Sequence, residues 1–143
     1  MIILRRITIW FVLAVSVVSI GCGRESGDLD PSAPENAEVV EEARRVVDEI
    51  DQGQYGEVRK RFDKRMTASL SEDQLAKGWE AFESLKGAMR SQGPVEVFKR
   101  REYTVVNVEL DLAKTKAQMR VTFDKQGKIA GLYFLDAGAP VPD

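Results

Sequence analysis

The sequence predicts an α+β fold in which N-terminal helices pack on one face of a curved antiparallel sheet. Two observations predict this class. Apolar residues recur at helical spacing between residues 35 and 90, and at every second position between residues 95 and 135. A helical half followed by a strand half is typical of α+β domains rather than of alternating βα units.

The first helix is predicted over about Glu35–Asp51, because apolar residues recur along it every three or four positions. Those residues are Val39, Ala43, Val46 and Ile50. Ser32 lies three residues before Glu35, and this spacing predicts a capping box at the start of the helix. Gly53 is expected to end it.

Two further helices are expected before the strands. The apolar positions of a short one are Tyr55, Val58 and Phe62. The other is predicted over about Glu72–Arg90 and begins with a capping box of Ser71 and Gln74. Its residues at helical spacing are Leu75, Trp79, Phe82, Leu85 and Met89. Gly93 and Pro94 are expected to end the helical half.

Alternation of apolar and polar residues then predicts four strands. A short first strand contains Val95 and Val97. The apolar face of the second strand consists of Val106, Val108, Leu110 and Leu112. That of the third consists of Ala117, Met119, Val121 and Phe123. Asp124–Gly127 is a predicted hairpin turn before the closing strand Lys128–Leu135, in which Gly131 favours a bulge.

The N-terminus has the features of an export signal. Arg5 and Arg6 accompany an apolar run from Ile7 to Ile20, which is shorter than the about 20 residues that cross a bilayer. The run leads into Ser19–Cys22, which resembles the lipobox of bacterial lipoprotein precursors. Ser19 departs from that pattern, because a large aliphatic residue is usual at this place.

The lipobox resemblance implies that residues 1–21 are a cleaved signal peptide and that Cys22 carries acyl chains such as palmitate. The polar stretch of residues 22–34 is then a flexible tether. The chain is accordingly expected to be exported and anchored through its lipid at the cell envelope, on the outer membrane or the periplasmic face if the cell is Gram-negative. A plain signal peptide with an incidental cysteine and an uncleaved anchor are the two alternatives.

Composition excludes several classes of function. The formal net charge is −2, with acidic and basic residues interspersed, so we expect no nucleic-acid partner. The basic run Arg59–Arg61, with Lys64 and Arg65, is interpreted as the solvated face of a short helix. The chain has one cysteine and no histidine. It therefore lacks the usual zinc and copper ligands and the commonest general base, and we expect neither a metal nor a cofactor.

Two segments carry a second resemblance. Ser71–Trp79 and Phe123–Phe134 resemble a bacterial domain family of unknown function in the cystatin-like, nuclear-transport-factor-like superfamily, over about Glu38–Leu135. Members of that family are secreted proteins or lipoproteins, or precede α/β-hydrolase domains. The resemblance implies a cone-shaped fold over residues 35–136, with a cavity at its open end and a tail of residues 137–143. It supplies no catalytic residues to carry over.

Three carboxylates are the candidates for acid–base chemistry, namely Glu109, Asp111 and Asp136. Alternation places Glu109 and Asp111 on the same strand face, where a concave site would make them share a proton. The simpler interpretation, which we favour, is that they form cross-strand charge pairs with basic residues of the next strand, such as Lys116 and Arg120.

Five aromatic residues are the candidates for lining a pocket. Trp79 and Phe82 would form an aromatic wall, although their helical spacing is more typical of a core. Tyr55, Tyr103 and Tyr133 would place hydroxyls at a cavity rim, or bond within the fold.

These observations favour a non-catalytic, envelope-anchored lipoprotein whose domain binds a small ligand or a protein partner. A homodimer through the outer sheet face is a further expectation. Two alternatives stay open. One is a small enzyme of the isomerase or dehydratase type that uses an Asp/Glu–Tyr pair in the cone. The other is an accessory module for a separate hydrolase.

Overall fold

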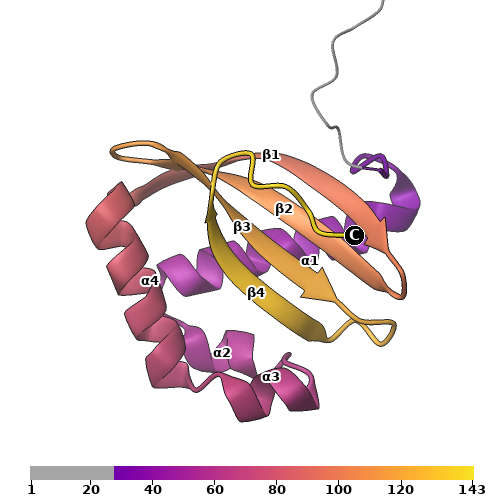
Figure 1. The fold of residues 1–143 in the computed structure, drawn as a ribbon, viewed down its shortest axis with the longest axis horizontal. Coiled ribbons are helices and arrows are strands. Elements are labelled where there is room, and N and C mark those ends of the chain that lie inside the picture. The colour runs from indigo at the N-terminus through magenta and orange to yellow at the C-terminus, as the bar shows by residue number, and fades with distance from the viewer. Residues whose placement is uncertain (1–27) are drawn as a thin grey trace, which may run out of the picture.

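The computed structural model describes residues 28–143, and Figure 1 shows how their helices and strands are arranged. Four helices, α1 to α4, precede four strands, β1 to β4. This is an α+β arrangement with an open antiparallel sheet, consistent with a nuclear-transport-factor-like fold, and the predicted fold class is confirmed. The predicted signal peptide, Cys22 and much of the tether lie outside the described residues.

Helix α1 spans Pro34–Asp51, close to the prediction, but it begins differently. Its N-cap is Ala33, with no side-chain cap, so the capping box predicted for Ser32 and Glu35 is wrong. The backbone N–H of Ser32 instead donates to Oδ1 of Asp30 at 2.8 Å. Pro34 is tolerated at the start because the first helical turn has no use for its missing N–H.

Two short helices follow where one was predicted. Helix α2 spans Tyr55–Arg59, and helix α3 spans Lys64–Ser69. Phe62 belongs to neither helix; it is buried and forms an isolated bridge with Ile129. Helix α3 was not predicted, because none of its residues is buried and its sequence therefore has no apolar stripe.

Helix α4 spans Glu72–Lys86 and has the predicted capping box, with Ser71 and Gln74 bonded reciprocally. It ends at Gly87, so the predicted extension to Arg90 is wrong. Gly87 has a φ of 89° and ψ of 163°, a conformation that almost only glycine adopts. Met89 lies four residues after Leu85, which fits the spacing of a helix, but its position also fits the alternation of a strand. In the structure it is the first residue of β1.

The sheet has the order β1-β2-β3-β4, with every neighbouring pair antiparallel. The strands span Met89–Arg100 (β1), Tyr103–Leu112 (β2), Lys116–Phe123 (β3) and Ile129–Asp136 (β4). Gly93 and Pro94 do not end the helical half as predicted; they lie inside β1, where the register with β2 shifts. Proline is tolerated there because an edge strand with a bulge needs fewer donors.

The predicted features of the last hairpin are confirmed. Gly127 closes the turn with a φ of 73°. Thr122 pairs with Gly131 while Phe123 pairs with Ile129, so one residue of β4 is extra and forms a bulge beside Gly131.

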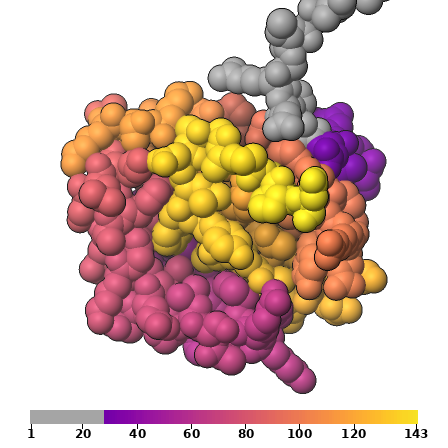
Figure 2. Space-filling model, in the orientation of Figure 1, coloured from indigo at the N-terminus to yellow at the C-terminus, as the bar shows by residue number. Residues whose placement is uncertain are grey.

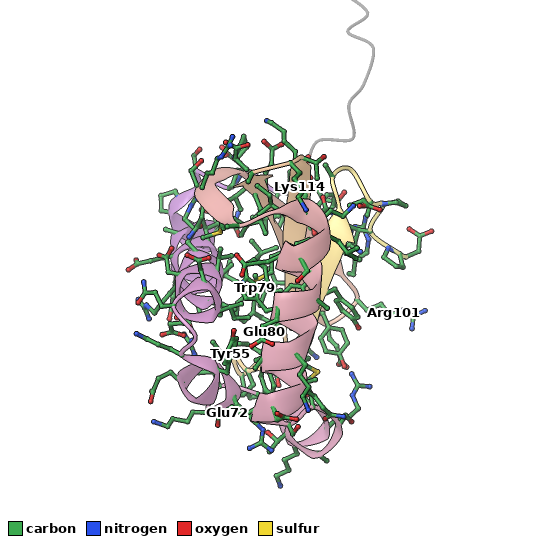
Figure 3. All side chains as sticks on the ribbon, turned by 90° about the vertical axis from the view of Figure 1, so that its left-hand side faces the viewer. Tyr55, Glu72, Trp79, Glu80, Arg101 and Lys114 are labelled. Carbon is green, nitrogen blue, oxygen red and sulfur yellow. The ribbon has the colours of Figure 1, made fainter. Side chains whose placement is uncertain are left out.

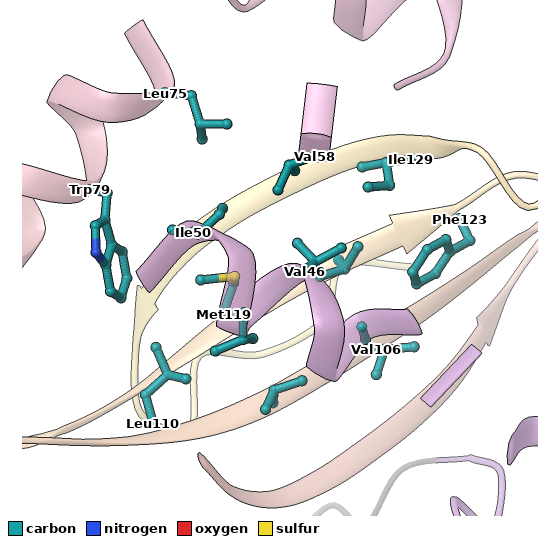
Figure 4. Close-up of a cluster of buried hydrophobic side chains, with 14 of the residues drawn as sticks. Val46, Ile50, Val58, Leu75, Trp79, Val106, Leu110, Met119, Phe123 and Ile129 are labelled. Carbon is teal, nitrogen blue, oxygen red and sulfur yellow. The ribbon is translucent and has the colours of Figure 1, made fainter. Parts of the chain in front are cut away.

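The core lies between the helices and the inner face of the sheet. Figure 4 shows α1 side chains such as Val46 and Ile50 packed on Val106, Leu110 and Met119 of the strands. Trp79 of α4 is 2% exposed and completes the same cluster. These large side chains fill the interior, and two hollows among the described residues, lined by Asp124, Lys125 and Gln126 among others, lie at the surface.

The segment before α1 is attached to the edge of the sheet. The backbone N–H of Leu29 donates to the carbonyl of Val97 at 3.0 Å, and Asp28 forms an ion pair with Arg100. These contacts cover part of the free edge of β1. Asp28 and Leu29, which precede the predicted domain boundary at residue 35, therefore pack with the fold. No helix within residues 28–143 has the length and apolar character needed to cross a bilayer.

Candidate binding site on the outer sheet face

The outer face is the sheet surface turned away from the helices, and one polar row crosses it from edge to edge. The register aligns Glu96 of β1 with Asn107 of β2, Asn107 with Arg120 of β3, and Arg120 with Tyr133 of β4. Strict alternation produces this row, because the residues on either side of each member point into the core. Tyr133 is 54% exposed, whereas Asn107 and Arg120 are buried.

The C-terminal segment Ala137–Asp143 explains this burial. The chain turns back after β4 through Gly138, which has a φ of 74°, and the N–H of Ala139 donates to the carbonyl of Asp136. Figures 1 and 2 show the end of the chain lying over the outer face of the sheet. The carbonyl of Ala139 accepts from Nη2 of Arg120 at 2.7 Å and from Nε2 of Gln118 at 3.0 Å.

Arg120 is the charged group at the centre of the outer face, and it is only 7% exposed. Its Nε donates to Oδ1 of Asn107 at 2.9 Å. No carboxylate among residues 28–143 lies within ion-pair distance of it. Burial lowers the pKa of the Arg120 guanidinium, and the nearby Tyr133 opposes that change. A buried cation that lacks a counter-ion is costly, which makes this face suited to an anion.

Two donors of this row have no partner among the described residues. They are Nη1 of Arg120 and Nδ2 of Asn107, and neither is sealed from solvent. A guanidinium carries five N–H donors in a planar fork, of which the fold uses those on two nitrogens. The outer face can therefore donate further hydrogen bonds to a bound group.

The candidate acids do not form a catalytic pair. Glu109 lies 2.5 Å from Nζ of Lys116, so the predicted cross-strand charge pair is confirmed for this residue. Asp111 faces Lys116 in the register of the two strands. Asp136 is exposed and forms an ion pair with Lys86 of α4. Arg120, offered as a further partner for these acids, bonds to Asn107 instead.

Trp79 and Phe82 belong to the packing of α4 on β4. Their ring centroids lie 5.7 Å apart, and each packs on Phe134, at 5.2 Å and 5.5 Å respectively. Such clusters contribute about 0.5–1.5 kcal/mol per ring pair beyond burial. The core interpretation of the two residues is thus supported. Nε1 of Trp79 is buried without a hydrogen-bond partner.

The three tyrosines lie in different parts of the molecule. Tyr55 of α2 is near Glu80 of α4 (Figure 3), and burial, followed by the charges of Glu80, Glu83 and Asp51, raises the pKa of its hydroxyl. Tyr103 lines a surface groove. Tyr133 lies on the outer face, with its ring over Gly131, where an added β-carbon would come within 3.0 Å of it. Of the five predicted pocket residues, only Tyr103 lines either of the two surface grooves described below.

Two surface grooves lie at the end of the sheet that carries the hairpin turns. The one of about 490 Å³ lies between the β3–β4 turn and α1, and the one of about 380 Å³ lies between the two hairpin turns and Asp63, which precedes α3. Most of the charged residues in their lining are acidic, namely Glu35, Glu38, Glu42, Asp63, Glu102 and Asp124. Lys125 is shared by both grooves. No cluster of three or more potential metal ligands exists within the part of the chain that the structure describes.

The basic run was interpreted as a solvated face, and this is wrong for two of its members. Arg59 donates to the carbonyls of Thr67 and Leu70 and so ties α2 to the end of α3. Arg61 forms ion pairs with Glu42 and Glu49 of α1. Charge spacing in the sequence does not reveal such inward contacts, because the partners are distant in the chain.

The fold and the outer face together define a small α+β domain with a polar row across its outer sheet face and a packed interior. The chain belongs to the family described as "Protein of unknown function (DUF3887)", which matches residues 43–132. Asn107, Gln118 and Arg120 lie within the matched range, whereas Cys22 and the C-terminal segment lie outside it. No curated protein and no solved structure matches the chain.

Proposed function

We propose that this protein is an envelope-anchored lipoprotein whose domain is a non-catalytic binding module, with the outer sheet face as its binding surface. The observation that carries the binding role is Arg120, a buried cation whose partners among the described residues are all uncharged. Ionisable groups whose pKa is perturbed by burial cluster at functional sites. A buried cation such as Arg120 is stabilised when an anionic partner pairs with it.

The anchor is supported by the N-terminal sequence. A basic pair, an apolar run of signal-peptide length and a small residue before Cys22 agree on one export signal. Two or three acyl chains on Cys22 would hold the domain stably at a membrane, whereas one chain is marginal. Residues 22–34 are polar and rich in Gly, Pro and Ser, as expected of a tether between a lipid and a domain.

A catalytic role has less support. The acids proposed for it, Glu109 and Asp136, each have a lysine partner. An acid that acts as a proton donor at neutral pH needs an apolar or like-charged setting, and a lysine has the opposite effect. The accessory role beside a separate hydrolase is compatible with a binding module, and no residue of the described chain favours it specifically.

Thermal unfolding of the full chain tests the binding role. A panel of small carboxylates, phosphates, sugars and short peptides is screened for compounds that raise the melting temperature. A ligand at 100 times its Kd stabilises the folded state by about 2.7 kcal/mol, which corresponds to a rise of several degrees. We expect Arg120→Gln to abolish the rise.

Arg59→Gln is the matched control for this screen, because Arg59 also bonds to two carbonyl oxygens but lies on the other side of the molecule. It should leave the ligand-induced rise unchanged. A rise that persists in Arg120→Gln would contradict the assignment of the binding surface.

A further inference from the structure

We propose that Arg120 and Gln118 form a carboxylate-binding site, and that the C-terminal segment Ala137–Asp143 is a strap that the carboxylate ligand displaces. This inference rests on the proposed function, because it names the chemical class of the ligand and the way it reaches the outer face.

The donors already converge on one oxygen. Nη2 of Arg120 and Nε2 of Gln118 both donate to the carbonyl of Ala139, at 2.7 Å and 3.0 Å. A carboxylate oxygen in that position would accept the same two bonds, and its negative charge would strengthen both. Its second oxygen would be within reach of Nη1 of Arg120, which has no partner among the described residues. The Nη1–Nη2 edge of a guanidinium matches the two oxygens of a carboxylate.

The surrounding charges favour a singly charged anion over a phosphate. Lys116, the nearest lysine along the strand, is engaged with Glu109. Glu96 stands in the same row as Arg120, two strands away, or about 10 Å at the usual strand spacing. Lys116 and Glu109 neutralise each other, so a dianion would find only Arg120 to compensate its two charges, with Glu96 on the same face, whereas a carboxylate needs only the one cation.

The strap is weakly attached. Besides its turn bond to Asp136, its hydrogen bonds to the described residues are the two that the carbonyl of Ala139 accepts. Pro140 and Pro142 lack N–H groups, so they cannot donate to the strands as a fifth strand would. Gly138, in the left-handed region, supplies a hinge at its start. Segments with so few bonds open at low free-energy cost.

A purely structural role for Arg120 is the competing explanation. Arg59 also bonds to two carbonyl oxygens, and there the arrangement joins two helices. The two roles differ in what an added carboxylate does. A structural arginine keeps its carbonyl partner, whereas a receptor exchanges it for the ligand.

Nuclear magnetic resonance of the ¹⁵N-labelled full chain tests this inference. The probes are N-acetyl-dialanine, which carries a free carboxylate, its neutral C-terminal amide, and inorganic phosphate, all at constant ionic strength. The signals followed are the Nε–H of Arg120 and the backbone amides of Gly138, Ala139 and Val141. We expect the carboxylate form to change the chemical shifts of all these signals in a saturable way that fits one Kd. The amide signals of the strap should move towards the chemical shifts of an unstructured chain.

Variants sharpen the test. Arg120→Gln should weaken binding by about tenfold or more, because it removes the charge from the hydrogen bonds. Arg59→Gln should leave the Kd unchanged. A chain that ends after Asp136 should bind the carboxylate more tightly than the full chain, since no closed strap competes with the ligand.

Three results would overturn the inference. The neutral amide could shift Arg120 as strongly as the carboxylate, phosphate could bind as well, or the strap amides could stay unchanged while the carboxylate binds. In each of these cases the outer face still binds a ligand through Arg120 and the proposed function stands. If no probe changes the Arg120 signal and the thermal screen shows no rise in melting temperature that depends on Arg120, both the carboxylate inference and the proposed binding function are refuted.

Discussion

Three arginine side chains of this domain have three different kinds of partner. Arg61 lies between two carboxylates, Glu42 and Glu49, and forms a largely buried ion-pair group. Arg59 satisfies carbonyl oxygens at the end of α3. Arg120 bonds to an amide and a carbonyl and has no counter-ion among the described residues. Only the Arg61 arrangement neutralises the arginine charge. Of the other two, Arg59 is partly exposed to solvent, whereas Arg120 is buried, and this difference is why we assign the recognition role to Arg120.

Replacement of Arg61 by Gln is expected to lower the free energy of unfolding by about 1–3 kcal/mol, because Glu42 and Glu49 lose their shared cation while largely buried. Urea unfolding of the full chain measures the change. Lys60→Gln removes only an exposed pair with Glu57 and should cost less than about 1 kcal/mol. Equal losses for the two variants would contradict the inward role of Arg61.

The carboxyl group of Asp51, at the end of α1, is expected to make the free energy of unfolding depend on pH. Burial, and then the charge of Asp48, raises the pKa of its carboxyl above 3.8, so the folded state penalises the charged form. Asp51→Asn should therefore be slightly more stable than the wild type at pH 7, by less than about 1 kcal/mol because solvent screens the group. The advantage should vanish below the ordinary pKa, where both states hold the proton. Urea unfolding at pH 7 and pH 3 checks this, and an advantage that grows at pH 3 would contradict it.

At the scale of elements, the junction between α4 and β1 depends on a single glycine. A β-carbon on Gly87 would lie 2.7 Å from Cβ of Ala113 and 3.0 Å from the backbone nitrogen of Lys114. The helix must end there so that the chain can pass this close to the β2–β3 turn. Its backbone conformation is also one that other residues rarely adopt.

Gly87→Ala is expected to destabilise the fold by about 1–3 kcal/mol through strain alone, with the steric overlap adding to this. Gly127→Ala is the matched control, because it also has a positive φ but its β-carbon would meet nothing within 4 Å. Thermal unfolding should show a clearly lower melting temperature for Gly87→Ala than for Gly127→Ala. The reverse order would mean that the close approach to Ala113 does not exist.

Periodicity predicts the elements that have one buried stripe and fails where two rules compete. Helices α1 and α4 and strands β2 and β3 follow their predicted spans within a few residues, except at the end of α4. Met89 continues the helical spacing of Leu85, and only Gly87 between them indicated the break. Phe62 is buried through a bridge to a strand that comes much later in the chain, which local spacing cannot reveal.

The sequence predicts on which strand face the candidate site lies, but not that its residues are buried. Alternation correctly placed Arg120 and Asn107 on the polar face of their strands, where exposure was expected. Their burial comes from the C-terminal segment, which folds back without any periodic signal. Gly138 and the two prolines after it were the available indications of a turn followed by an unpaired chain.

For the molecule as a whole, the segment before α1 and the C-terminal segment both lie against the sheet. Leu29 contacts the free edge of β1, and the C-terminal strap crosses the outer face (Figure 1). The helices occupy the inner face, and the interior between helices and sheet is filled.

Lipid anchoring at Cys22 is the central part of the proposed function. Intact-mass analysis of the membrane fraction, for the wild type and for Cys22→Ala, tests it most directly. We predict a wild-type chain that begins at Cys22 and carries the added mass of its acyl groups, and a Cys22→Ala variant that is lost from the mature membrane form. A soluble mature chain without lipid, or a membrane-bound chain that still begins at Met1, would contradict it.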